Sequence, residues 1–254
     1  MNSDRPVKQR ADIALVERGL VESRSKAQAL ILAGQVFSDE QRIDKPGQVI
    51  RNEQPLNVRG GERYVSRGGD KLAGALADLP LKMEPWVCVD VGASTGGFTD
   101  CLLQEGVSKV YAVDVGQGQL AHKLRQDPRV VVREGVNARH LRHSDFEEAI
   151  DLVVVDASFI GIGKLLPAIT NFLKPTGLLL AMIKPQFEAG ETEARKARGV
   201  IRDETVRQAV LEQVRQQIRE AGFAIAAECD SRLRGPKGNL EHFVLCSRSA
   251  VDRQ

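Results

Sequence analysis

The 254-residue sequence has few aromatic side chains, only four cysteines and no long apolar run. Its longest uninterrupted apolar stretch, from Leu178 to Ile183, is far shorter than the roughly 20 residues that a membrane-spanning helix needs. The cysteines form no Cys-x-x-Cys pair, so we expect neither a disulfide framework nor a structural zinc site. The first twelve residues carry charges and no apolar segment, which predicts no secretory signal and a cytoplasmic protein.

What the chain does have, 42% hydrophobic and 28% charged residues, is typical of one large folded domain, alone or with a small one. The charge is unevenly distributed. Up to Arg67 the basic side chains outnumber the acidic ones, whereas the remainder is close to neutral. This asymmetry suggests a polyanion-binding module attached to another activity, although a solvated surface gives the same pattern.

The segment 10–50 predicts two short helices in succession. In each, apolar side chains recur at helical spacing and a glycine follows as a stop signal. Ser23 is a suitable N-cap for the second helix. Basic side chains occupy the remaining faces, and such side chains on adjacent helices can contact several phosphates of one strand. The apolar positions are Ala11, Ala14 and Leu15, then Ala27, Leu30 and Ile31, with Gly19 and Gly34 as stops.

The run RADIALVERGLVESRSKAQALILAGQVF resembles the RNA-binding module of ribosomal protein S4. The resemblance implies a small α+β RNA-binding domain over residues 1–58. It also implies ribosomal RNA or ribosomal subunits as the partner, with no membrane and no obligate protein partner. One departure lies at 37–40, where Phe-Ser-Asp-Glu replaces the usual Val-Asn-Gly, so the sequence does not predict a tight hairpin. The expected RNA contacts in this module are Arg10, Arg18, Arg24 and Lys26.

Residues 59–69 are polar and rich in glycine, which predicts a linker. From 70 to 250, strand-like apolar runs alternate with helix-length segments, which is typical of an α/β domain whose mostly parallel sheet has helices on both faces. The last strands can form a hairpin. A polar stretch at 185–202 is expected as a surface excursion that can close over bound RNA. The expected strands are 87–91, 109–114, 130–133, 152–156, 178–183, 223–227 and 243–246, with a long helix at 204–220.

The first of these strands leads into an acidic, glycine-rich loop, DVGASTGGFTD. Glycines allow the backbone to approach a ligand, and the next helix offers unpaired N–H groups. Because the loop is neither a G-x-G-x-x-G fingerprint nor a P-loop, an adenosyl ligand with a sulfonium cation, S-adenosylmethionine, is favoured over NAD or ATP. Asp114, at the end of the next strand, is placed to accept hydrogen bonds from ribose hydroxyls. The expected cofactor contacts are Asp90, Gly92, Ala93, Ser94, Gly96, Gly97, Phe98, Asp114, Val115, Asn137 and Asp156.

Four ionisable residues stand where strand ends or loops converge: Lys71, Asp156, Lys184 and Glu241. Each alone is more typical of a solvated cap, but fully apolar parallel strands deliver their last residues to the ligand crevice. Methyl transfer to a ribose hydroxyl requires alignment of the oxygen and removal of its proton. A partly desolvated lysine beside another cation can act as base once its pKa falls by roughly 3 units, which neighbouring carboxylates oppose. The sequence leaves open whether Lys184 accepts the proton or only orients the hydroxyl.

The segment from Ser66 to Ser247 resembles the FtsJ-like ribose 2′-O-methyltransferases, which have a Rossmann-like sheet of seven strands and use lysine, aspartate, lysine and glutamate in that order. The resemblance places these roles on Lys71, Asp156, Lys184 and Glu241. With the N-terminal module, the strings YVSRGGDKL, DASFI, IKPQFE and GNLEHF make the chain similar to the TlyA family of ribosomal RNA cytidine 2′-O-methyltransferases, also called haemolysins. We therefore expect this activity, without a metal, and further RNA contacts from Arg67, Arg232 and Arg234.

Other methyl-transfer chemistries fit the sequence less well. Amino-group methyltransferases usually carry Asp/Asn-Pro-Pro-Tyr where this chain has Asp-Ala-Ser-Phe at 156–159. Methylation of cytosine carbon five needs a nucleophilic cysteine, and none lies at the corresponding strand ends. Two alternatives of another class remain, a membrane-active haemolysin and a non-catalytic RNA-binding protein.

Overall fold

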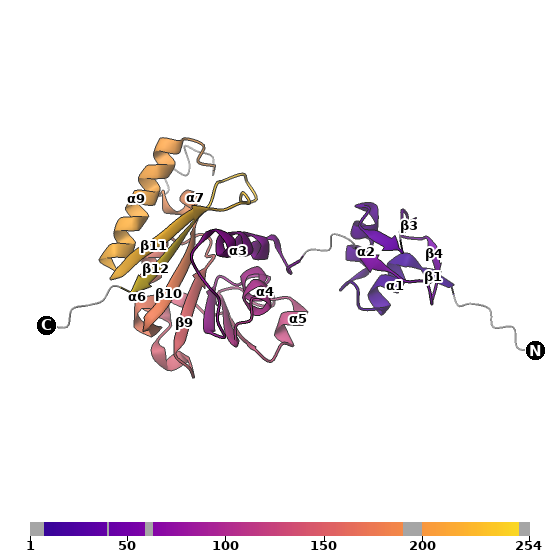
Figure 1. Cartoon of the computed structure of the whole chain (residues 1–254), viewed down its shortest axis with the longest axis horizontal. Coiled ribbons are helices and arrows are strands. Elements are labelled where there is room, and N and C mark those ends of the chain that lie inside the picture. Colours follow the sequence, from indigo (N-terminus) through magenta and orange to yellow (C-terminus); the bar gives the residue numbers. More distant parts are fainter. Residues whose placement is uncertain (1–7, 40, 59–62, 190–199, 249–254) are drawn as a thin grey trace, which may run out of the picture. The chain divides into compact units, whose positions relative to one another are not determined.

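The computed structural model describes residues 8–39, 41–58, 63–189 and 200–248. Most of the expected excursion at 185–202 lies outside these residues. Contacts divide the chain into two units, residues 1–63 and 64–254, each with its own apolar core (Figure 1). We describe each unit by itself.

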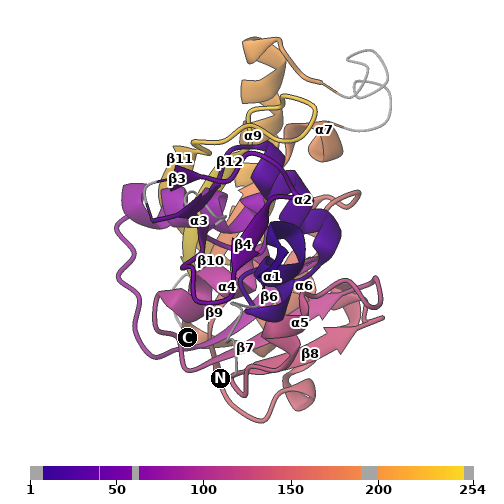
Figure 2. The ribbon, with the colours of Figure 1, turned by 90° about the vertical axis from the view of Figure 1, so that its right-hand side faces the viewer.

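The N-terminal unit contains the two short helices that the apolar spacing predicts, and they lie side by side (Figure 2). The Ser23 hydroxyl accepts the N–H of Lys26, which confirms it as the cap of the second helix. Apolar side chains of both helices pack against Ile43, Ile50 and Leu56 to form the core. The elements are β1 (Lys8–Arg10), α1 (Ala11–Glu17), α2 (Arg24–Leu32), β2 (Val36–Ser38), β3 (Gln41–Arg42), β4 (Val49–Arg51) and β5 (Asn57–Val58).

Two small antiparallel pairings complete this unit. Strand β1 pairs with β4, and β2 lies between β3 and β5. The tight β2–β3 hairpin, which the sequence did not predict, is present because Asp39 takes a positive φ of 53°. Aspartate tolerates this left-handed region better than most residues, so it can replace the usual Asn-Gly pair.

The C-terminal unit is built on a seven-stranded sheet in the order β11-β12-β10-β9-β6-β7-β8. Strands β6 to β10 run parallel, while β12 is antiparallel to both β10 and β11, so the expected terminal hairpin is confirmed. The strands are β6 (Val87–Val91), β7 (Lys109–Asp114), β8 (Val130–Glu134), β9 (Ile150–Val155), β10 (Leu173–Ile183), β11 (Phe223–Asp230) and β12 (His242–Arg248).

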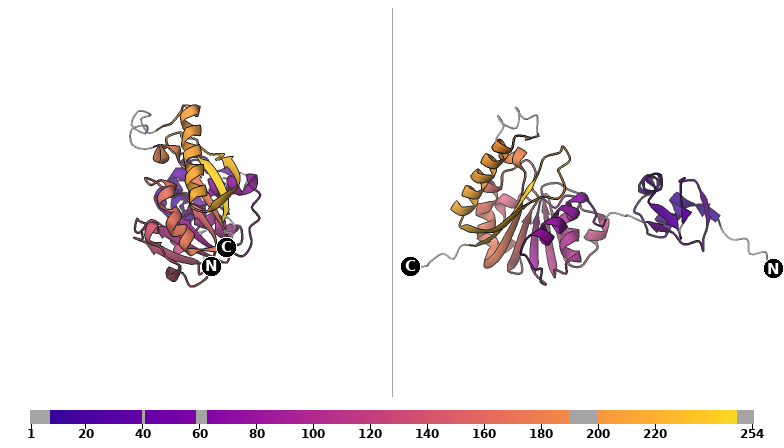
Figure 3. Two further views of the ribbon diagram at one scale, coloured as in Figure 1. Left: turned by 90° about the vertical axis from the view of Figure 1, so that its left-hand side faces the viewer. Right: turned by 45° about the horizontal axis from the view of Figure 1, so that its top comes forward.

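Helices cover both faces of this sheet, as expected for a Rossmann-like domain (Figure 3). Apolar side chains of α3, α4 and α5 pack on one face, and those of α6 and α9 pack on the other. The helices are α3 (Arg67–Asp78), α4 (Gly97–Gln104), α5 (His122–Arg125), α6 (Leu166–Phe172), α7 (Pro185–Glu188) and α9 (Glu204–Glu220); the 3₁₀ turns are η1 (Ala138–His140), η2 (His143–Asp145) and η3 (Ile162–Lys164).

The structure differs from the expected linker at 59–69. Tyr64 is buried in the core of the C-terminal unit, the N–H of Val65 donates to the Asp100 carboxylate at 2.8 Å, and α3 already begins at Arg67. Tyr64 packs on Gly69, where a Cβ would lie 2.2 Å from the Tyr64 Cγ. The second unit therefore begins at Tyr64, because the Tyr64 ring packs against Gly69 of α3.

We predict that Gly69→Ala destabilises the C-terminal unit, because the added methyl group must displace a buried tyrosine. Overpacking of this kind lowers the free energy of unfolding by about 1–3 kcal/mol. Gly74→Ala in the same helix is the matched control, since its Cβ would meet only the side chain of Arg232, at 3.1 Å. There the gain in helix propensity, about 0.5–1 kcal/mol, should offset any cost. Urea unfolding of the full chain measures both, and equal effects of the two substitutions would contradict this packing.

Candidate active site

The carboxyl ends of the adjacent strands β6 and β9 meet around one glycine. Gly92 has a φ of 86°, and a Cβ there would lie 2.8 Å from the carbonyl oxygen of Asp156. The N–H of Asp156 in turn donates to the carbonyl of Val91 at 2.9 Å. Any larger residue at 92 would strain the backbone and push the two strand ends apart. Gly92 thus sets how closely the loop after β6 approaches Asp156.

A cavity of about 580 Å³ opens beside these strand ends. The Asp114 carboxylate, at the end of β7, accepts the N–H of Ser94 at 2.8 Å and the N–H of Gly116 at 2.7 Å. It thereby holds the loops after β6 and β7 around the cavity. Of the expected cofactor contacts, the structure places six in the cavity wall: Gly92, Ser94, Asp114, Val115, Asn137 and Asp156.

The other five expected contacts are absent from the residues that line this cavity, and their direct contact with a cofactor stays a prediction. Asp90 is fully buried, and its Oδ2 accepts the N–H and the hydroxyl of Thr99, at 2.9 and 2.7 Å, so it anchors the start of α4. Burial raises the pKa of Asp90 to about 7. Within the described part of the chain, its Oδ1 has no hydrogen-bond partner. The remaining four are Ala93, Gly96, Gly97 and Phe98.

Sequence reasoning missed much of the opposite wall. Apolar side chains from the loops after β8 and β9 line it, together with the side chain of Gln119. Glu134, at the end of β8, accepts the N–H groups of residues 118–120 and the guanidinium of Arg125. The Arg125 guanidinium and these N–H groups lower the pKa of Glu134 to about 2. The missed lining residues include Val113, Gln119, Ala138, Ile160 and Leu165.

This set of groups fits an adenosyl ligand. Apolar side chains offer a surface for a flat base, and the Asp114 carboxylate stands at the end of β7, where ribose hydroxyls are bound in related sheets. The unpartnered Oδ1 of the buried Asp90 adds an acceptor for a cationic or hydrogen-bonding group near the same loop. The cavity wall carries two carboxylates, Asp114 and Asp156, against one guanidinium, Arg139, and is therefore suited to a nucleoside that carries a positive rather than a negative charge.

A second cavity, of about 780 Å³, adjoins the first. Four residues at the end of β9 line both cavities: Asp156, Ser158, Phe159 and Ile160. All four ionisable residues that the sequence singled out lie in the wall of the second cavity: Lys71, Asp156, Lys184 and Glu241. The fold thus brings together side chains from α3, the ends of β9 and β10, and the loop before β12.

These four side chains form two close ion pairs. Lys71 Nζ lies 2.5 Å from Glu241 Oε2, and both side chains are almost completely buried. Lys184 Nζ lies 2.5 Å from Asp156 Oδ1 and 2.8 Å from the hydroxyl of Ser158. Burying a charge without a partner is costly, so each lysine requires its carboxylate. Asp156 and Ser158 hold the Lys184 ammonium at the boundary of the two cavities.

Phe159 is the most unusual residue of this boundary. Its side chain is 89% exposed, and its φ of 65° lies in the left-handed region that bulky residues rarely adopt. The ring lies 4.9 Å, centroid to centroid, from that of Phe187 in α7. A strained backbone that exposes an aromatic ring beside a cavity is typical of a functional position. Sequence reasoning did not single out this residue.

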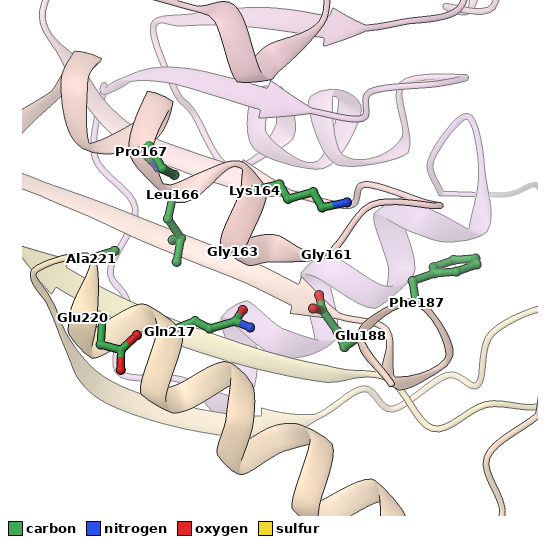
Figure 4. Close-up of a pocket in the computed structure, with 10 residues that line it drawn as sticks. All are labelled: Gly161, Gly163, Lys164, Leu166, Pro167, Phe187, Glu188, Gln217, Glu220 and Ala221. Carbon is green, nitrogen blue, oxygen red and sulfur yellow. The ribbon is translucent and has the colours of Figure 1, made fainter. Parts of the chain in front are cut away.

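A third cavity, of about 530 Å³, shares Gly161, Lys164 and Phe187 with the second (Figure 4). One oxygen of Glu188 accepts the N–H of Ile162 at 2.9 Å, and a Cβ on Gly161 would lie 2.8 Å from the other. Burial raises the pKa of Glu188 to about 7. Helix α7 is thus attached to the 157–162 loop at two points, Phe187 with Phe159 and Glu188 with Ile162.

The arginines expected to contact RNA near this site have partners within the C-terminal unit. Arg232 forms a two-point ion pair with Asp78, at 2.5 and 2.9 Å, which lowers the pKa of Asp78. Arg67 donates to the carbonyl of Arg234 at 3.4 Å, and Arg234 donates to that of Gly238 at 3.0 Å. These contacts shape the loop before β12, and contact with RNA stays a prediction for all three arginines.

In the N-terminal unit, the four expected RNA contacts differ in their surroundings. Arg18 donates to three backbone carbonyls between Arg51 and Gln54, so it joins α1 to that turn. Arg10 and Arg24 both pair with the buried Asp12 while remaining about half exposed. Lys26 lies in the first turn of α2. Arg10 and Arg24 are therefore the better placed of the four to reach a ligand.

Two further findings limit the chemistry. Within residues 8–39, 41–58, 63–189 and 200–248, no three His, Cys, Asp or Glu side chains gather as a metal site, and no helix is long and apolar enough to cross a membrane. Burial raises the pKa of the Cys229 thiol to about 11 and that of Cys246 to about 12. Protonated thiols are poor nucleophiles, which disfavours a covalent cysteine mechanism at these positions.

Comparisons with known proteins agree with this geometry. The FtsJ-like methyltransferase model matches residues 64–249, and the S4 domain model matches residues 9–54. The 16S/23S rRNA (cytidine-2′-O)-methyltransferase TlyA of Mycobacterium tuberculosis is 42% identical, over 96% of this chain and 91% of that protein. Hemolysin A of Brachyspira hyodysenteriae is 41% identical, over 93% of this chain and 100% of that protein. A solved structure from Streptococcus thermophilus is 40% identical, with a TM-score of 0.72, and covers 96% of this chain and 90% of that chain.

The resemblance drawn from the sequence motifs is thereby confirmed. Both family models match the segments in which the motifs lie, and the alignments with the two curated relatives cover 93% and 96% of this chain. The chain belongs to the FtsJ-like methyltransferase family, and an S4 domain precedes its methyltransferase domain.

Proposed function

We propose that this enzyme transfers a methyl group to the ribose 2′-hydroxyl of a cytidine in ribosomal RNA. The observation that carries the proposal is the gathering of Lys71, Asp156, Lys184 and Glu241 in one cavity that shares a wall with the nucleoside-sized cavity. The TlyA relative is named for this reaction. Because ribosomal RNA is the substrate, we place the reaction in the cytoplasm. These ionisable groups favour an enzyme over the membrane-active and the non-catalytic alternatives.

The first cavity holds the cofactor, S-adenosylmethionine. Asp114 accepts hydrogen bonds from the ribose hydroxyls, and the apolar side chains of Val113, Val136 and Leu165 contact the adenine. Asp90, whose Oδ1 is unpartnered among the described residues, and the 92–97 loop serve the methionine part. When bound, the cofactor supplies an electrophilic methyl group, so the protein needs neither a metal nor a covalent intermediate.

The protein's task in the second cavity is to position an alcohol oxygen and to favour loss of its proton. Lys184, held by Asp156 and Ser158 at the boundary of the two cavities, binds the 2′-oxygen. In the transfer, an oxygen–carbon bond forms, the sulfur–carbon bond breaks and the hydroxyl proton passes to solvent water. The Lys184 cation stabilises the negative charge that develops on the oxygen, which is the largest contribution that a preorganised site can make. Lys184 thus orients the hydroxyl.

The Lys71–Glu241 pair lines the same cavity and positions the nucleotide. Its burial and 2.5 Å separation fix both side chains. The exposed ring of Phe159, supported by Phe187, is placed to stack on the base of the target nucleotide. The S4 domain supplies further contacts to the RNA, which raises affinity without changing the chemical step. Pairing of each cation with a fixed carboxylate holds these side chains in the geometry that the reaction needs.

We predict that Asp114→Ala weakens cofactor binding by about 10- to 100-fold, because two loops and the ribose lose hydrogen bonds to a charged group. Isothermal titration of the full chain with S-adenosylmethionine measures the affinity. Asp145→Ala is a control, since the Asp145 side chain accepts only the N–H of Arg142, among the described residues, and does not line the cavity. An unchanged affinity of the Asp114 variant would place the cofactor elsewhere.

We predict that Lys184→Ala lowers the rate of methyl transfer by about 100-fold or more, while leaving cofactor affinity nearly intact. Incorporation of labelled methyl into ribosomal RNA measures the rate. Lys174→Ala is the matched control, because Lys174 lies in the same strand and also pairs with an aspartate, Asp151. We expect this control to retain wild-type activity. Full activity of the Lys184 variant would remove the proposed mechanism.

We predict that Arg10→Ala with Arg24→Ala weakens the binding of ribosomal RNA and flattens its dependence on salt concentration. Each lost phosphate contact lowers the slope of the logarithm of affinity against that of salt by about 0.7–0.9. Filter binding to transcribed 23S ribosomal RNA over a range of potassium chloride concentrations gives this slope. If affinity and slope stayed at wild-type values, the RNA would bind elsewhere on the chain.

A further inference from the structure

The core of the N-terminal unit carries a buried carboxylate that the proposed function has not used. Asp12, in α1, has no exposed surface. Arg10 Nε and Nη2 donate to its two oxygens, each at 3.0 Å. From α2, the Arg24 Nε and the Gln28 amide donate to its Oδ2, each at 2.9 Å. One carboxylate thus joins three side chains from two elements.

This carboxylate stays charged. Its hydrogen bond to Arg10, together with those to Gln28 and Arg24, holds the pKa of Asp12 far below its ordinary value despite burial. The arginines it binds are not buried with it: 45% of the Arg10 side chain and 56% of the Arg24 side chain are exposed. Asp12 therefore accepts hydrogen bonds from both guanidinium groups, while about half of each arginine side chain remains exposed to solvent.

The local backbone is arranged to accept this cluster. Arg24 and Gln28 stand one turn apart in α2 and reach Asp12 from the same face of that helix. Gly47 leaves room for Arg10, because a Cβ there would lie 3.0 Å from its Nη1. The two guanidiniums are thus fixed relative to each other, although they come from segments that are fourteen residues apart in the chain.

We propose that Asp12 is a positioning residue for RNA binding, and that it holds Arg10 and Arg24 as a preformed site for backbone phosphates. The proposal rests on the proposed function of the S4 domain as the RNA-binding unit. With two arginines and one carboxylate, the cluster keeps a net positive charge. Ordering a long arginine side chain on binding is costly, so side chains that are ordered in advance bind more tightly.

An acidic group beside a phosphate site has two opposing effects on RNA affinity. The direction in which the affinity changes when the acidic charge is removed therefore tests the proposal. If only charge mattered, removing the Asp12 charge would strengthen RNA binding, because it makes the surface more positive. If Asp12 acts by positioning, removing its charge weakens binding, because one amide oxygen cannot replace two carboxylate oxygens that accept four N–H donors.

The test compares Asp12→Asn with Asp44→Asn in the full chain. Asp44 belongs to the same unit and pairs with Arg42, but both side chains are about 60% exposed, so this control makes the same change in charge on the surface. Filter binding to transcribed 23S ribosomal RNA gives the dissociation constant. We expect Asp12→Asn to raise it by about three- to tenfold and Asp44→Asn to leave it unchanged or lower it slightly.

Kinetics separate positioning from a merely structural loss. We expect the Asp12 variant to raise KM for ribosomal RNA while kcat and the affinity for S-adenosylmethionine stay at wild-type values. Because a buried substitution can disturb folding, Arg24→Lys is a second variant: it keeps the charge at a half-exposed position but loses the Nε through which Arg24 donates to Asp12. It should weaken RNA binding in the same direction.

The outcomes are distinct. Wild-type or tighter RNA binding by Asp12→Asn, or by Arg24→Lys if the Asp12 variant fails to fold, would overturn the positioning role while leaving the S4 domain as the RNA-binding unit. Wild-type binding by the double variant Arg10→Ala with Arg24→Ala would instead remove the proposed function of this unit, and the role of Asp12 with it.

Discussion

The close approach of Gly92 to the end of β9 is the constraint on which the active site depends. Because a side chain at 92 would meet the backbone of Asp156, the loop after β6 and the end of β9 that carries Asp156 can come together only around a glycine. The two cavities share a wall at that point. Asp156 then orients Lys184 at the boundary. The backbone contact between Gly92 and Asp156 therefore determines where the Lys184 ammonium group lies.

Carboxylates act as organisers in both units. Asp114 holds two loops around the cofactor cavity, Asp90 anchors the start of α4, and Asp12 joins two arginines in the S4 domain. In each case the acid accepts hydrogen bonds from groups that come from different segments. A residue that the sequence predicts to contact a ligand can thus act indirectly, by holding in place the groups that contact the ligand.

The sequence predicted the sheet, its two helical layers and the convergence of four ionisable residues, because apolar strands in a parallel sheet direct their last residues to one edge. It could not predict contacts that depend on tertiary packing. Tyr64 reads as part of a polar linker until Gly69 is seen beneath its ring. Phe159 reads as an ordinary apolar residue until its left-handed backbone is known. The arginine ligands of Asp12 read as free basic side chains, since nothing in their spacing shows that they share a carboxylate.

The most direct test of the central claim is the identity of the atom that receives the methyl group. Ribosomal RNA methylated in vitro by the full chain is digested to nucleosides and analysed by mass spectrometry against ribosomal RNA incubated without enzyme. If Lys184 orients a ribose 2′-hydroxyl beside the cofactor cavity, the methylated RNA gains 2′-O-methylcytidine and gains no base-methylated nucleosides. A methyl group on the cytosine ring or its exocyclic amine would contradict the account.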